Sequence, residues 1–208
     1  MLSTNCPACG AQLQFKSKLT VSLSCGYCSA LIVRDSNDIR NAGKIGALLE
    51  DTSPLQLYST GQSQLGQFQT IGRCQWSFDD GFWNEWFINF STGKSGWLAE
   101  AQGQYVVCVE DSSTKLLPSL KNLRVGQNLK IGKDDFSIDD IKKATLAAFE
   151  GELPFSPRKG DSKTIVDLSR EDSYACIEFS ADGVSCSRGS VFEFDELNFK
   201  NLRRSHDQ

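Results

Sequence analysis

Two Cys-x-x-Cys pairs near the start constrain this chain more than any other feature. Cys6 and Cys9 form the first pair, Cys25 and Cys28 form the second, and 15 residues separate the pairs. Two intervening residues let both thiolates of a pair face one ion, and the spacing is typical of zinc ribbons. Because four sulfurs in a tetrahedron leave no open position for water or substrate, the pattern predicts a structural Zn²⁺ site.

Two other kinds of site use the same residues. An iron–sulfur or redox centre is one, and a disulfide framework is the other. Residues 1–6 show no cationic region followed by an apolar core, so we expect no secretory signal, which argues against disulfides.

We place the ribbon at residues 1–34, with strands at 12–15 and 19–24 joined by a turn at 16–18. A module of this size buries too little apolar surface to fold alone. Metal binding, on the order of 10–16 kcal/mol, would supply the missing stability.

Charge and hydropathy exclude several functions. The 208 residues carry a net charge of −4, and no apolar run approaches the roughly 20 residues of a membrane span. The ribbon has three cations, Lys16, Lys18 and Arg34, and no acid. Four thiolates and one Zn²⁺ would reduce this surplus to about one charge, which is no basic patch. We therefore expect a cytoplasmic protein, and nucleic-acid binding stays an alternative that this charge does not favour.

Histidine usage argues against several enzyme mechanisms. His206 is the single histidine and is the third residue from the end of the sequence. Catalytic zinc or iron sites need two or three histidines, and a hydrolytic triad needs one that is held in place. Cys74, Cys108, Cys176 and Cys186 show no pair spacing, so we interpret them as small core residues.

The rest of the chain indicates a mainly β protein. Residues 35–54 form a polar linker in which Ile39, Ile45 and Leu48 recur at helical spacing, so we expect one short helix before Pro54. From residue 55 to 203, short alternating runs are separated by glycine-containing turns, which predicts a β-sandwich or a barrel-like domain.

A weak internal similarity suggests a duplication. Residues 123–127 resemble residues 58–62, which predicts halves at 55–115 and 120–203. The repeat conflicts with the local pattern at 137–149, which is that of a capped helix. We expect a strand there, because tertiary context overrides propensity.

All four tryptophans, Trp76, Trp83, Trp86 and Trp97, fall within 22 residues. They could line an aromatic groove for a ligand or peptide, or they could fill the core of a small sheet. Alternation with polar residues favours the core. Glu85 shares a face with Trp83, and Arg73 is its expected partner.

Several motifs resemble the bacterial family named domain of unknown function 4178, in which a Cys-x-x-Cys ribbon often comes first. They are Ile71-Gly72-Arg73, Trp83-Asn84-Glu85-Trp86, Gly96-Trp97-Leu98-Ala99-Glu100, Gly151-Glu152-Leu153-Pro154-Phe155, Asp167-Leu168 and the ending Leu197 to Arg203. Ser187-Arg188-Gly189 departs from the aromatic residue expected before that glycine. The resemblance implies a cytoplasmic bacterial protein with a link to envelope-stress or polyamine-related genes, and an adaptor in place of an enzyme.

Three functional hypotheses follow. The first is a non-catalytic zinc-ribbon adaptor or scaffold that binds a protein partner. Its candidate surface is Arg73, Trp83, Glu85, Trp86, Trp97, Glu100 and Glu152. The second is a nucleic-acid-binding ribbon protein. The third is a carboxylate-based hydrolase or transferase, which would need two of Glu85, Glu100, Glu152 and Asp167 in one cleft.

Overall fold

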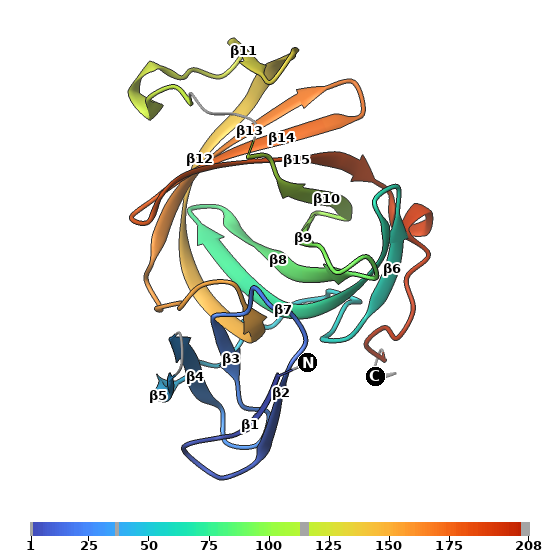
Figure 1. Ribbon diagram of the computed structural model, residues 1–208. Coiled ribbons are helices and arrows are strands. Elements are labelled where there is room, and N and C mark those ends of the chain that lie inside the picture. The colour runs from blue at the N-terminus through green and yellow to red at the C-terminus, as the bar shows by residue number, and fades with distance from the viewer. Residues whose placement is uncertain (1, 36–37, 113–116, 205–208) are drawn as a thin grey trace.

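The computed structural model describes residues 2–35, 38–112 and 117–204, and His206 lies outside them (Figure 1). These residues are mainly β, as expected, and the ranges contain no α-helix. The strands are β1 (Leu2–Asn5), β2 (Gln12–Phe15), β3 (Ser22–Ser24), β4 (Ala30–Asp35), β5 (Asp38–Lys44), β6 (Thr60–Ser63), β7 (Gly66–Phe78), β8 (Gly81–Phe90), β9 (Ser95–Ala101), β10 (Gln104–Glu110), β11 (Asn128–Ile131), β12 (Asp134–Leu153), β13 (Ser162–Arg170), β14 (Ser173–Ser180) and β15 (Gly183–Phe192). Two short 3₁₀ segments, η1 (Leu120–Asn122) and η2 (Phe194–Leu197), complete the set.

The main body is a sheet that closes on itself. Antiparallel pairing runs β7–β8–β9–β10–β15–β14–β13–β12, and β12 pairs with β7 to complete the ring. Figure 1 shows these strands arranged as a ring. The fold is therefore the barrel-like alternative of the two that the sequence predicted, and its closure leaves few free strand edges.

The two halves of the ring have the same strand order. Each begins with a short strand, β6 or β11, that pairs with a long strand, β7 or β12, and each continues with three further antiparallel strands. This order fits the predicted halves, while an ancestral duplication stays a prediction. Residues 137–149 lie within β12, so the expected strand is confirmed. Pairing with β7 and β13 outweighs the local helical pattern.

The ribbon does not contain the expected hairpin of residues 12–15 and 19–24. Instead β2 pairs with β1, whereas β3 pairs with β4 and with the end of β12. The prediction was wrong because the intervening residues bind the main body and so carry β3 away from β2. In Figure 1 the ribbon lies below the ring, beside the end of β12.

The short helix expected in residues 35–54 is also absent. Part of this segment is β5, which pairs with β4, and residues 45–54 are irregular. Hydrogen bonds to the main body replace helical ones, since the backbone of Leu49 donates to Gln75 at 2.6 Å and accepts from it at 3.2 Å.

The sheet is covered on its outer side by the chain's own connections. Leu55 and Leu197 are buried with Trp86 and Leu98 over one half of the ring. Over the other half, Leu123 and Ile131 are buried, together with strand residues of β12 to β14. Within the described ranges, no helix is both long and apolar enough to cross a membrane.

Candidate functional site

The four ribbon cysteines form a compact cluster. Their sulfurs all lie within 4.8 Å of one another, and the Cys6–Cys28 and Cys9–Cys25 sulfur pairs are each 3.8 Å apart. A tetrahedron with metal–sulfur bonds of ~2.3 Å has edges of about 3.8 Å. The cluster could therefore hold one divalent ion with little movement.

Both pairs turn through the same local hydrogen bonds. Gly10 N–H donates to the Cys6 carbonyl at 2.8 Å, and Ser29 N–H donates to the Cys25 carbonyl at 2.9 Å. These two donors have positive φ, +79° and +55°, whereas Gly26 does not. Burial by itself raises the pKa of Cys25, but N–H donors from Cys28 and Tyr27 and neighbouring thiols lower it to about 7. Such donors favour the thiolate that a metal binds.

Glu152 ties the ribbon to the ring. Its carboxylate is buried and accepts hydrogen bonds from Lys16 N–H at 2.9 Å, Ser17 N–H at 3.3 Å and the Thr20 hydroxyl at 2.6 Å. The preceding sheet residue, Gly151, receives support from Ser24, whose hydroxyl accepts its N–H at 2.5 Å. Glu152 is therefore a structural anchor of the loop between the two cysteine pairs.

Arg73 belongs to a buried network on the outer side of the sheet. It forms an ion pair with Asp51, donates to Asn84 at 2.8 Å, and stacks on Trp86 at 4.7 Å. The expected pair of Arg73 with Glu85 is wrong, because Arg73 lies opposite Trp86 in the register and so faces away from Glu85.

Glu100 lies in the same outer network. Its carboxylate accepts hydrogen bonds from Ser53 at 2.7 Å, Trp86 at 3.0 Å and Asn84 at 3.2 Å. Because Ser53 comes from the segment before β6, this network fastens that segment to the sheet. The carboxylate is buried and its contacts are structural.

A second charged cluster lies inside the ring. Lys163 of β13 donates to both oxygens of Glu85 on β8, at 2.8 and 2.9 Å, and to Glu178 on β14 at 2.7 Å. Strands β12 and β7 separate β13 from β8 in the sheet, so these side chains meet across the interior. Burial alone would lower the pKa of Lys163, but the two carboxylates raise it well above its ordinary value.

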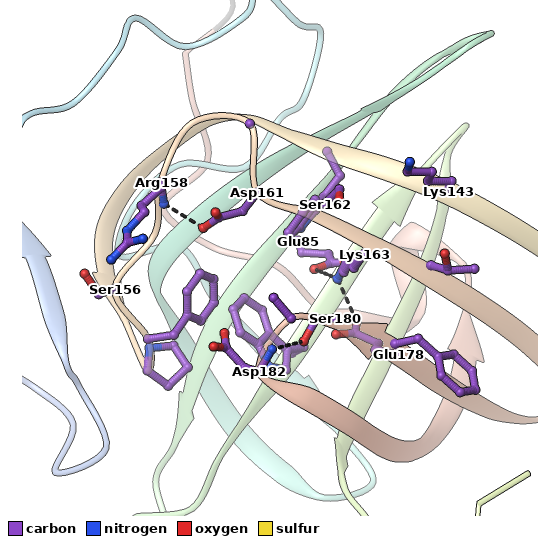
Figure 2. Close-up of a pocket in the computed structure, with 18 residues that line it drawn as sticks. Glu85, Lys143, Ser156, Arg158, Asp161, Ser162, Lys163, Glu178, Ser180 and Asp182 are labelled. Atoms are coloured by element: carbon purple, nitrogen blue, oxygen red, sulfur yellow. Dashed lines mark hydrogen bonds and ion pairs between the residues drawn. The ribbon is translucent and has the colours of Figure 1, made fainter. Parts of the chain in front are cut away.

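These three residues line a cavity of about 980 Å³. The aromatic walls of the cavity are Trp76, Trp97, Phe155 and Phe179. Figure 2 shows Lys163 between Glu85 and Glu178, with Arg158 and Asp161 above this cluster and to its left. Ligand cavities of drug-sized molecules span roughly 300–1,000 Å³, and closed sheets of eight strands can hold one small ligand. The cavity is thus large enough for a small organic molecule.

The four tryptophans are divided between the two sides of the sheet. Trp86 is fully buried in the outer network, whereas Trp76 and Trp97 line the interior cavity. Trp83 is half-buried and donates to Glu85 at 3.0 Å. The predicted surface of seven residues is therefore not one groove, since Arg73, Trp86 and Glu100 lie outside, Glu152 lies at the ribbon, and Glu85 and Trp97 lie within.

The carboxylates considered for catalysis do not share the cavity. Glu85 lines it, but Glu100 and Glu152 are bound elsewhere, and Asp167 accepts a hydrogen bond from Tyr174 at 2.5 Å. Burial raises the pKa of the Cys74, Cys108 and Cys176 thiols, which fits their interpretation as core residues.

Sequence reasoning missed Lys163 and Glu178, which complete the interior cluster. The signal was present, because Lys163, Ile165 and Asp167 alternate along one face of a strand. A lysine at such an inward position needs a partner, but its partner Glu85 is 78 residues away.

Comparison with known proteins places the chain in a family. The model of the family described as Domain of unknown function (DUF4178) matches residues 56–194, which include the whole ring. The chain belongs to this family. No curated protein and no solved structure matched the chain.

Proposed function

We propose that this protein is a non-catalytic binding module that takes a small organic ligand into the interior of its closed sheet. The observation that carries this proposal is the cavity of about 980 Å³ with aromatic walls around the Lys163 cluster. Phe87, Leu146 and Phe149 belong to a buried cluster that fills part of the interior, and the cavity takes up the part beside Lys163.

The absence of catalysis is part of this proposal. Lys163 is held as an ammonium by Glu85 and Glu178, which removes it as a nucleophile. Both oxygens of Glu85 accept hydrogen bonds from Lys163, and Oε1 also accepts from Trp83, so this side chain is held in a structural contact.

We propose that the ribbon carries Zn²⁺ in a structural role. Four thiolates with tetrahedral spacing suit Zn²⁺, and the anchor at Glu152 connects the metal-bound loop to the ring. Such thiolates persist in a reducing compartment, which supports the cytoplasm as the location.

A protein partner is the second candidate, and Tyr27 is the observation that favours it. This side chain is 86% exposed at the second cysteine pair. Exposed aromatic residues are typical anchors of protein interfaces. Loss of a co-purifying protein in the variant Tyr27→Ser, but not in Lys44→Ser, would support this function.

Nucleic-acid binding gains no support from the ribbon's cations. Lys16 stacks on Tyr58 at 4.6 Å, and Arg34 stacks on Phe15 and donates to the Lys18 carbonyl at 2.8 Å. Two of its three cations are therefore engaged within the chain.

The test of the cavity uses N-phenyl-1-naphthylamine, a neutral dye that fluoresces when it leaves water. We expect saturable binding of one dye per chain. The variant Ser162→Trp at the cavity rim should weaken binding, whereas Ser173→Trp, at an exposed strand end that does not line the cavity, should not. Equal binding by both variants would contradict the proposal.

A further inference from the structure

In the interior cluster, one carboxylate oxygen is free to accept a hydrogen bond, whereas all three protons of the ammonium are already donated. The three donor bonds of Lys163 go to Glu85 Oε1, Glu85 Oε2 and Glu178 Oε1. Among the described residues, no hydrogen bond or ion pair is made to Glu178 Oε2, and this side chain is 36% exposed and lines the cavity. A ligand can therefore donate to this cluster, but an anion finds no free ammonium proton.

The balance of charges in the cavity also favours a cationic ligand. At the rim, the cations Lys143 and Arg158 are balanced by Asp161 and Asp182, and all four are exposed. Deeper, one ammonium faces the two carboxylates of Glu85 and Glu178. The inner part of the cavity therefore has one more carboxylate than ammonium, which favours a cationic ligand.

The aromatic wall supplies a surface for an apolar body. Trp97 contacts Phe155 with ring centres 6.4 Å apart and contacts Phe87 at 5.2 Å. Flat aromatic faces beside carboxylates also attract organic cations.

One buried polar atom in the wall lacks a partner. Trp76 is 6% exposed, and its indole Nε1–H has no hydrogen-bond partner among the described residues. Buried donors are nearly always paired, and leaving one unpaired costs about 1–3 kcal/mol. The atom itself is enclosed by its neighbours, so this donor is not open to a molecule in the cavity.

From the carboxylates and the aromatic wall we infer that the cavity binds an organic ammonium compound that carries an apolar body. Its ammonium donates to Glu178, and its apolar body lies against Trp97 and Phe155. This inference rests on the proposed binding function and names the ligand class for that same cavity.

The experiment compares three probes that share a phenyl ring and a hydroxyl group and differ in one group. They are 2-amino-1-phenylethanol, 1-phenylethane-1,2-diol and mandelate, which carry an ammonium, a hydroxyl and a carboxylate at that position. Isothermal titration calorimetry on the full chain should show the ammonium probe binding at least tenfold more tightly than the other two. Equal binding of the diol, or tighter binding of mandelate, would overturn the inference.

Two variants test whether Glu178 is the group that binds the ammonium. Glu178→Gln should weaken the ammonium probe about tenfold, as expected for loss of one charge-assisted hydrogen bond, and should leave the diol unchanged. The control Glu110→Gln makes the same change at an exposed residue outside the cavity and should alter neither probe. An unchanged ammonium affinity in Glu178→Gln would overturn the inference.

The comparison of probes uses the unaltered protein, so the inference stays testable if Glu178→Gln does not fold. Binding of the naphthylamine dye distinguishes a wrong ligand class from a wrong binding function. If the dye binds but the ammonium probe shows no preference, the ligand class is wrong and the binding function stands. If neither binds, both proposals fail.

Discussion

Replacing Glu152 with glutamine should loosen the ribbon from the ring. The carboxylate accepts from three groups, of which the Lys16 N–H and the Thr20 hydroxyl make the shorter bonds, at 2.9 and 2.6 Å. Hydrogen bonds to a charged group contribute about 1.5–3 kcal/mol each. Glutamine keeps one acceptor oxygen and places an amide donor against the other donors. We expect a loss of about 3 kcal/mol in the free energy of unfolding.

Urea denaturation followed by tryptophan fluorescence measures this loss, because all four tryptophans lie in β7 to β9. With a urea dependence of about 2 kcal/mol per molar, the midpoint should fall by about 1.5 M. The matched control Glu171→Gln, at an exposed turn, should stay within about 0.5 kcal/mol of the unaltered protein.

A double-mutant cycle with Thr20→Val assigns the effect to the contact. The two changes should be less than additive by about 1 kcal/mol, because each removes the same hydrogen bond. If Glu152→Gln leaves the urea midpoint unchanged, the carboxylate does not anchor the ribbon and the argument fails.

Three further predictions follow from the metal centre, the interior cluster and the ring closure. Chelation of the metal should open the loop at Lys16 and Lys18 to trypsin, while the paired strands β7–β10 and β12–β15 stay resistant. An unchanged digestion pattern would count against a metal-dependent ribbon. Burial raises the pKa of Glu178 above its ordinary value; Lys163 opposes this rise, and Glu85 and Asp167 add to it. The affinity for the ammonium probe should therefore fall as the pH falls through that raised pKa, because protonation removes the charge that binds the ammonium. An affinity that does not change with pH in calorimetry would contradict this prediction. Gly189→Ala should lower the free energy of unfolding by about 3 kcal/mol, because the added Cβ would lie 2.0 Å from the Val107 carbonyl oxygen where β10 meets β15. In the control Gly26→Ala, the added Cβ meets no atom within 4 Å, so the stability should not change. Similar urea midpoints for the two variants would refute this close approach.

The parts of this structure that depend on local spacing could be predicted from the sequence. The four cysteines converge because each pair turns on itself through two intervening residues. Alternation along β8 correctly placed Trp86, Ile88 and Phe90 on one face and Glu85 on the other. Both features need only the geometry of a short segment.

The parts that depend on closure of the sheet could not be predicted in this way. Glu85 meets Lys163 only because β12 pairs with β7, which no local pattern encodes. A second long-range pairing, between β3 and the end of β12, takes the place of the expected ribbon hairpin. Residues 35–54 lack their predicted helix because hydrogen bonds to Gln75 and to β4 compete with helical ones.

A crystal structure of the protein with 2-amino-1-phenylethanol tests the ligand cavity most directly. We predict electron density for one molecule inside the ring, with its ammonium nitrogen about 3 Å from a Glu178 carboxylate oxygen and its phenyl ring against Trp97. An interior closed by side chains, or a probe bound only on the outer surface, would contradict the account.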